Sequence, residues 1–160
     1  MKRTLALICL ATFAANAHAG VKEKKALRAA DEKVAAAATQ MQTACGNGQL
    51  EVKIDWNAVD AMAEQNSEII KSKGMRLEWV YTQLGDRTVS TMEALGKICA
   101  DDTDYKGAIA EISIIQVQPK PKYDDYKSVF SLEGTTLSID NGWYMTRSAS
   151  DFRTRLLNLF

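Results

Sequence analysis

The sequence predicts a single small α+β domain in which N-terminal, central and C-terminal helices accompany a mostly antiparallel sheet. Two periodicities indicate this class. Apolar residues recur three and four apart in some stretches, as on one face of a helix, and alternate with period two in others, as in a half-buried strand. Residues 20–160 have the usual length of one domain and contain no Gly/Ser linker or internal repeat, so no domain boundary is expected. The two cysteines in this range predict one disulfide.

The first 19 residues have the three parts of a secretory signal peptide. Met1–Arg3 is positively charged, Leu5–Phe13 is apolar, and Ala17–Ala19 is a small-x-small cleavage site before Gly20. We therefore expect cleavage after Ala19 and export of residues 20–160 to the bacterial periplasm, an oxidising compartment.

Two other interpretations of this leader are weaker. A lipoprotein would need a small residue before its cysteine, but Ile8 precedes Cys9. An uncleaved anchor would need about 18 apolar residues, whereas the apolar run here breaks at Asn16. Cleavage after Ala17 is a second option and would leave His18 at the amino terminus. No membrane span is expected after cleavage.

Cleavage after Ala19 would remove the only histidine, His18, and with it most acid-base and metal chemistry near neutral pH. Lys2 and Arg3 account for two of the 20 basic residues, so 18 would face 20 acidic ones, without a long block of one sign. This charge pattern argues against nucleic acid as a partner. Neither a Ser-x-x-Lys dyad nor a Gly-x-Ser-x-Gly elbow occurs. We therefore expect neither an enzyme nor a cofactor.

Two cysteines, Cys45 and Cys99, follow the predicted cleavage site and leave one possible intrachain pairing. We predict a Cys45–Cys99 disulfide. Its role would be structural, because redox enzymes usually present a Cys-x-x-Cys pair. The bridge would close a loop of about 54 residues and stabilise the fold by about 4 kcal/mol in the chain-entropy estimate.

The N-terminal half predicts helices around one strand. A long alanine-rich helix is expected over Val21–Cys45, and the alternation of Leu50–Trp56 predicts a strand packed beneath it. Asn57–Lys73 predicts a helix that stops at Gly74 and can break in two at its polar middle, Glu64–Ser67.

The stretch Met75–Leu84 fits two structures. The alternation of its aromatic residues fits a strand, while the spacing of Leu77, Val80 and Leu84 fits a helix. Aromatic and β-branched content favours the strand. A helix capped by Asp86 and running to Cys99 would then follow.

The C-terminal half predicts the rest of the sheet. A short helix after Thr103 leads to a largely buried strand over Glu111–Gln118, which Pro119 ends. Ser148 or Ser150 caps a last helix, with Phe160 near the core. Between the strand over Glu111–Gln118 and this last helix, we expect a meander of three strands joined by hairpin turns, at Tyr126–Leu132, Thr135–Ile139 and Trp143–Met145.

A calcium-loop pattern at Asp102–Gly107 falls short of a metal site. Lys106 occupies a ligand position, and Ser113 stands at the twelfth position, where a bidentate glutamate is needed. The acidic residues are more simply cap and first-turn residues of the short helix. No metal is expected.

Paired carboxylates leave a hydrolase open. Asp124 and Asp125 are adjacent, whereas glycoside cleavage needs two carboxylates on opposite sides of a bound sugar. A second carboxylate such as Glu51 or Glu111 would have to approach them in the fold.

The best functional signal is aromatic, in two segments that follow the proline break and the Asn-Gly turn. Tyrosine and tryptophan beside carboxylates are typical of a recognition surface, and an acidic rim would suit a basic partner. Trp143 also fits the core. The candidate partner-binding residues are Tyr123, Asp124, Asp125, Tyr126, Trp143 and Tyr144.

In general class the chain is similar to periplasmic inhibitor and immunity proteins, and no motif carries specific residues across. We expect an exported, non-enzymatic protein that binds another protein of the cell envelope, such as a cell-wall-directed enzyme or toxin. One alternative is a structural or assembly factor of the envelope that makes its contact through Val21–Cys45. Another is a small carboxylate-dependent hydrolase of envelope polymers.

Overall fold

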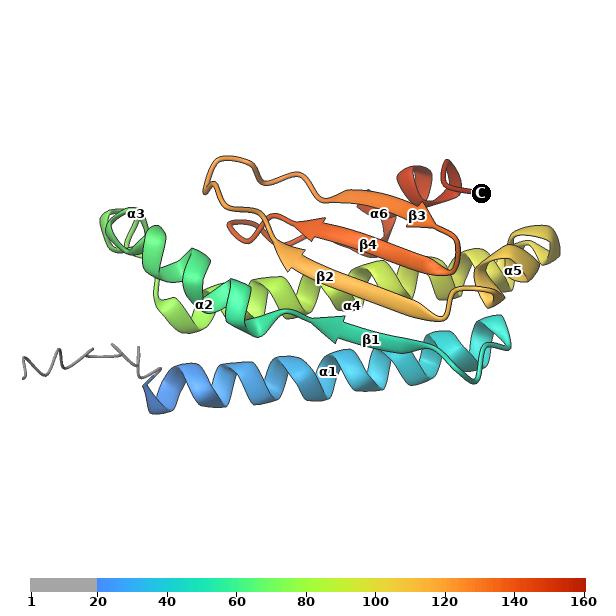
Figure 1. Cartoon of the computed structure of the whole chain (residues 1–160), viewed down its shortest axis with the longest axis horizontal. Coiled ribbons are helices and arrows are strands. Elements are labelled where there is room, and N and C mark those ends of the chain that lie inside the picture. The colour runs from blue at the N-terminus through green and yellow to red at the C-terminus, as the bar shows by residue number, and fades with distance from the viewer. Residues whose placement is uncertain (1–19) are drawn as a thin grey trace, which may run out of the picture.

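The computed structural model describes residues 20–160. The predicted signal peptide, with Cys9 and His18, lies outside this range. Over the described residues the chain forms six helices and one four-stranded sheet, which confirms the α+β class (Figure 1). The elements, in chain order, are α1 (Val21–Cys45), β1 (Glu51–Ile54), α2 (Trp56–Gln65), α3 (Ser67–Ser72), α4 (Leu77–Asp101), α5 (Thr103–Ala110), β2 (Ile114–Pro119), β3 (Val129–Glu133), β4 (Thr136–Asn141) and α6 (Ala149–Leu157).

The sheet is mixed, and the expectation of a mostly antiparallel sheet was wrong. Its strand order is β1-β2-β4-β3, in which β1 pairs parallel with β2, β2 pairs parallel with β4, and β3 pairs antiparallel with β4. Helices α2 to α5 lie between β1 and β2 in the chain and form the long crossover that a parallel pair requires. Strands β1, β2 and β4 therefore all end at the same edge of the sheet (Figure 1).

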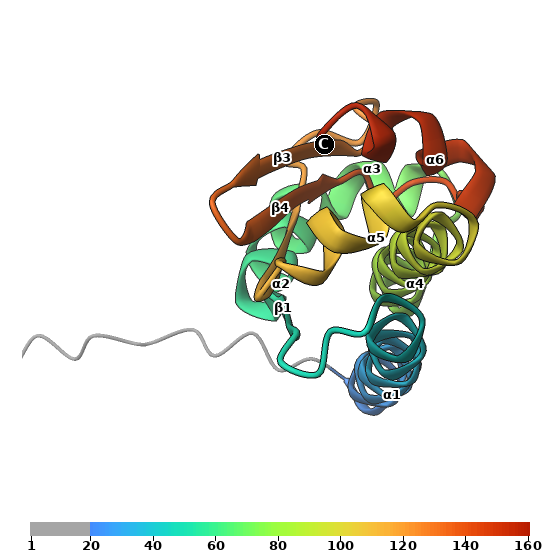
Figure 2. The ribbon, with the colours of Figure 1, turned by 90° about the vertical axis from the view of Figure 1, so that its right-hand side faces the viewer.

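Helices α1 and α4 pack side by side and parallel, on the same flank of the sheet (Figure 2). Ala30 of α1 lies against Gly85, and Met41 lies against Gly96, so the two helices keep a constant offset along their length. The predicted disulfide is confirmed: Cys45 and Cys99 are bonded, with their Cα atoms 5.1 Å apart. It joins the C-terminal ends of the two helices.

The main core lies between these helices and the inner face of the sheet. Its largest fully buried side chains include Met41, Met92, Ile115, Leu137 and Phe152. The outer face of the sheet is polar, because alternate residues such as those of β2 point to solvent.

The predicted strand over Met75–Leu84 was wrong, because the chain is helical from Leu77 onward. Val80, Tyr81 and Leu84 lie on the buried face of α4, while Trp79 is 42% exposed. The helical spacing of the apolar residues therefore describes this segment, and the aromatic alternation was accidental.

Asp86 is accordingly not an N-cap. It lies in the third turn of α4, where its carboxylate pairs with Lys33 of α1 at 2.8 Å. The predicted break in the preceding helix is confirmed: α2 and α3 are separated at Asn66, and Gly74 has a positive φ of 64° beyond α3.

The C-terminal region confirms one of the two predicted hairpins. Strands β3 and β4 form a hairpin around Gly134, whose φ is 58°, but Trp143–Met145 forms no strand. Ser148, one of the two predicted caps, is the N-cap of α6 and forms a capping box with Asp151. Phe160 is 37% exposed instead of lying near the core.

Candidate functional site

The parallel strands bring three segments together at one edge of the sheet. Strand β1 leads into α2, β2 leads into residues 120–128, and β4 leads into residues 142–148 (Figure 1). In open sheets with parallel strands, ligands bind outside the carboxyl ends of those strands. The predicted aromatic residues all lie in the two loops at this edge.

Arg87 of α4 connects the loops formed by residues 120–128 and 142–148. Its side chain projects from α4 and is fully buried. The guanidinium Nη1 donates to the carbonyl oxygen of Tyr126 at 2.7 Å and to Ser128 Oγ at 3.3 Å, and Nε donates to the carbonyl oxygen of Met145. One buried side chain therefore holds the backbone of both loops.

No carboxylate neutralises this guanidinium among the described residues, where it forms no salt bridge. Its Nη2 has no hydrogen-bond partner within residues 20–160. Burial, followed by the positive charges of Arg147 and Arg155, lowers the pKa of Arg87 to about 10. Burying an unpaired charge lowers the stability of the fold. The hydrogen bonds that Arg87 donates to the loop carbonyls offset part of this cost, and holding those carbonyls is a substantial part of what the side chain does.

The loop backbones also touch directly. A Cβ atom at Gly142 would lie 2.6 Å from the carbonyl carbon of Tyr126 and 2.7 Å from its Cα, so any larger residue would push the loops apart. Tyr126 and Met145, whose carbonyls Arg87 holds, remain 40% and 42% exposed. Arg147 lies over the Tyr126 ring, 5.4 Å from its centroid. We call Tyr126, Met145 and Arg147 the aromatic patch.

The other predicted aromatic residues support the loops from inside. Trp143 is fully buried, and its Nε1 donates to the carbonyl oxygen of Lys120 at 3.0 Å, so it makes no surface contact in this structure. Tyr123 is half-buried, with its ring centroid 6.0 Å from Trp143 and 4.3 Å from Tyr144. These residues form the base on which the loops rest.

The predicted acidic rim is of mixed charge. Asp124 and Asp125 are exposed, but Lys120 pairs with Asp125 at 2.9 Å, and Arg147 covers Tyr126. The charges at these loops therefore do not by themselves select a basic partner.

The structure does not bring the predicted second carboxylates to this edge. Glu51 begins β1 and lies in register with Ile114, the first residue of β2, whereas Asp124 follows the end of β2. Glu111 also precedes β2. Both glutamates therefore lie at the opposite edge of the sheet from Asp124 and Asp125.

The apolar face of α1 is used inside the domain. Its buried residues, Ala30, Val34, Ala37, Met41 and Cys45, include those that meet α4 at Ala30 and Met41. The proposed envelope contact through α1 would have to use its polar outer face.

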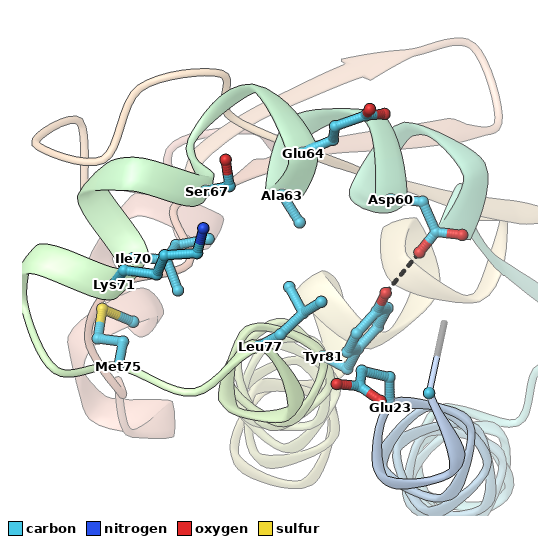
Figure 3. A pocket seen from close by; sticks show the side chains of 11 residues that line it. Glu23, Asp60, Ala63, Glu64, Ser67, Ile70, Lys71, Met75, Leu77 and Tyr81 are labelled. Carbon is cyan, nitrogen blue, oxygen red and sulfur yellow. Dashed lines mark hydrogen bonds between the residues drawn. The ribbon is translucent and has the colours of Figure 1, made fainter. Parts of the chain in front are cut away.

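Sequence reasoning missed a pocket next to these loops, between the start of α1, α2, α3 and the first turns of α4 (Figure 3). Its volume is about 360 Å³. It is lined by Gly20, Glu23, Asp60, Ala63, Glu64, Ser67, Ile70, Lys71, Met75, Leu77 and Tyr81.

A partly buried hydrogen bond lies at one wall of the pocket. The Tyr81 hydroxyl donates to Asp60 Oδ1 at 2.6 Å. Burial, the hydrogen bond to Asp60 and the charges of Asp60 and Glu23 raise the pKa of Tyr81 above its usual value. The phenol therefore stays protonated and fixes the Asp60 carboxylate at the pocket.

Comparison with models of known protein families, with curated proteins and with solved structures found no match for this chain. Within residues 20–160 no group of three or more His, Cys, Asp or Glu side chains is placed to hold a metal ion. No helix in the same range is long and apolar enough to cross a membrane.

Proposed function

We propose that this chain is an exported, non-enzymatic binding protein that captures another protein of the cell envelope through the aromatic patch. A cell-wall-directed enzyme or toxin, neutralised by the contact, is the partner that best fits export and the lack of a nucleophile motif. The patch consists of Tyr126, Met145 and Arg147, with Asp124 and Asp125 beside it.

The observation that carries the proposal is the position of Arg87. A fully buried guanidinium holds the carbonyls of Tyr126 and Met145, while the side chains of the same two residues point to solvent. Large apolar side chains are thus exposed on a backbone that cannot easily rearrange. A binding surface that is already ordered loses less conformational entropy when a partner docks.

The residue types also fit a protein interface. Tyrosine, methionine and arginine are enriched at interfaces relative to the rest of a protein surface. Arg147 stacks over Tyr126, which limits the motion of both side chains. Tyrosine and arginine are also the types that dominate binding energy when a partner desolvates them.

The test is capture of a partner from the periplasm. The tagged chain, expressed with its own leader in its native host, is purified from periplasmic extract, and co-purifying proteins are identified by mass spectrometry. We expect one stoichiometric partner. Replacing Tyr126 and Met145 together by alanine should weaken its capture about tenfold or more, because each hot-spot side chain contributes at least about 1 kcal/mol.

The matched control is Phe160→Ala, which removes another exposed aromatic side chain, packed on Tyr105 of α5 and far from the loops. This variant should capture the partner normally. Thermal unfolding of all variants checks that the domain stays folded. The absence of any stoichiometric partner, or undiminished capture by the double variant, would contradict the proposal.

A further inference from the structure

We infer that the pocket between α1, α2, α3 and α4 is a docking site for a lysine or arginine side chain of a partner protein. This inference extends the proposed function to a second contact, and its test does not depend on the aromatic patch. Three features of the pocket support it: its size, its apolar walls and the side on which its carboxylates gather.

The size of the pocket suits one long side chain. Its volume of about 360 Å³ is at the lower end of the range of about 300–1,000 Å³ for small-molecule sites. Ala63 keeps one wall open because its side chain is a single methyl group directed toward the space (Figure 3).

The walls suit an aliphatic stem. Ile70, Met75 and Leu77 line the pocket together with Ala63, and the Tyr81 ring closes one side. Lysine and arginine bury their methylene stems against apolar surfaces of this kind while keeping the charged group among polar partners. A short carboxylate or amide side chain would leave these walls uncovered.

Carboxylates gather on one side of the pocket. Figure 3 shows Asp60, Tyr81 and Glu23 on this side, with Lys71, Ile70 and Met75 across the cavity. Asp60 is held by the Tyr81 hydroxyl, and Glu23 is half-buried in the first turn of α1.

Glu64, an exposed residue of the pocket lining, adds a further negative charge. It lies in the last turn of α2, which contains no basic residue, and a helix C-terminus carries a partial negative charge that disfavours a carboxylate. Lys71, the basic side chain of the lining, has its Nζ 3.3 Å from Glu68 Oε1, and Glu68 is outside the pocket. Gly20, which would carry the α-ammonium group after cleavage, lines the pocket beside Glu23. An incoming cation would therefore meet Asp60 and Glu64 on the side of the pocket away from Lys71.

The experiment uses a capped tripeptide, Leu-Arg-Leu, and a matched peptide in which norleucine replaces arginine and keeps an apolar stem without the charge. The exported protein is labelled with ¹⁵N and titrated with each peptide at up to millimolar concentration. We expect saturable amide shifts confined to the pocket residues, with the arginine peptide binding about tenfold tighter than the norleucine peptide.

Two variants separate charge from shape. Glu64→Gln should weaken the arginine peptide about fivefold and leave the norleucine peptide unchanged. Ala63→Leu keeps every charge but fills the cavity, so both peptides should lose binding. The control is Glu111→Gln, which removes the same charge at the opposite end of the domain, beyond α5, and should bind as the original protein does.

Several outcomes would overturn the inference: no saturable binding, shifts centred outside the pocket, equal affinity for the two peptides, or undiminished binding by Glu64→Gln. The Tyr126→Ala variant should bind the arginine peptide normally. Failure of peptide binding would therefore leave partner capture by the aromatic patch untouched, and failure of capture would leave the pocket result standing.

Discussion

Two glycines of α4 test the parallel packing of α1 and α4. Both Gly85 and Gly96 lie inside the helix and face α1. A Cβ atom at Gly85 would lie 2.7 Å from Ala30 Cβ, which is closer than carbon atoms approach, and 3.3 Å from Ala30 Cα, a tight contact. At Gly96 the nearest atoms, Ala44 Cβ and Met41 Cα, are each 3.8 Å away, an ordinary contact.

The same substitution should therefore stabilise the domain at Gly96 and fail to stabilise it at Gly85. Alanine is about 1 kcal/mol better than glycine in a helix interior, so Gly96→Ala should raise the free energy of unfolding by about that amount. At Gly85 the same gain is opposed by overpacking, which typically costs about 1–3 kcal/mol. Gly85→Ala should range from neutral to about 2 kcal/mol less stable.

The assay is urea unfolding of the oxidised protein, followed by far-UV circular dichroism with the midpoint and slope fitted together. The double variant Ala30→Gly/Gly85→Ala moves the methyl group from α1 to α4 without changing the number of helical alanines. We expect its stability to return close to that of the original chain. Equal stabilisation by Gly85→Ala and Gly96→Ala would refute the close approach at Ala30.

Three further predictions follow from single features. Arg87→Met should lower the free energy of unfolding by about 2–6 kcal/mol, because two loop carbonyls lose their donor at about 1–3 kcal/mol each. Hydrogen exchange should show the two loops opening first, and unchanged loop exchange would count against their attachment to Arg87. Joint replacement of Cys45 and Cys99 by alanine should cost about 4 kcal/mol in urea unfolding, and a loss below about 1 kcal/mol would show that the bridge constrains little. The backbone amide and hydroxyl of Ser148 lower the pKa of Asp151, so the Asp151 carboxylate stabilises the fold above the usual aspartate pKa and this stabilisation is lost as the pH falls through the lowered pKa. The melting temperature of the original chain should exceed that of Asp151→Asn at neutral pH and converge with it in acid. A constant difference would rule out ionisation as the cause.

Elements with strong local signals were predictable from the sequence. The spacing of apolar residues located α1 within Val21–Cys45, and the Ser148 cap located the start of α6. The disulfide was predictable for a different reason, because after Gly20 just two cysteines remain to pair.

The misses come from tertiary context. Asp86 looks like a helix cap, but it lies inside α4 and pairs with Lys33 of α1. The neighbouring Gly85 is where α1 passes closely. Strand direction was also beyond the sequence pattern, since a parallel and an antiparallel strand can show the same alternation. The insertion of β4 between β2 and β3 depends on how the chain returns across the sheet.

The candidate site was found in part for a similar reason. The proline break and the Asn-Gly turn indicated the positions of the two loops, so Tyr126 was identified as a candidate binding residue. Arg87 was missed because an arginine within a helical stretch normally lies in solvent. The pocket was missed because four elements contribute to it, and one of them, the start of α4 with Tyr81, had been assigned to a strand.

The disulfide also determines what a protease could release from this domain. The bond between Cys45 and Cys99 closes a covalent ring that contains β1, α2, α3 and nearly all of α4. A single cut at an exposed position in this ring, such as Lys73–Gly74 after α3, would leave both fragments joined, with α1 still bonded to α4. A cut in residues 120–128, outside the ring, would instead free the C-terminal fragment from any covalent tie.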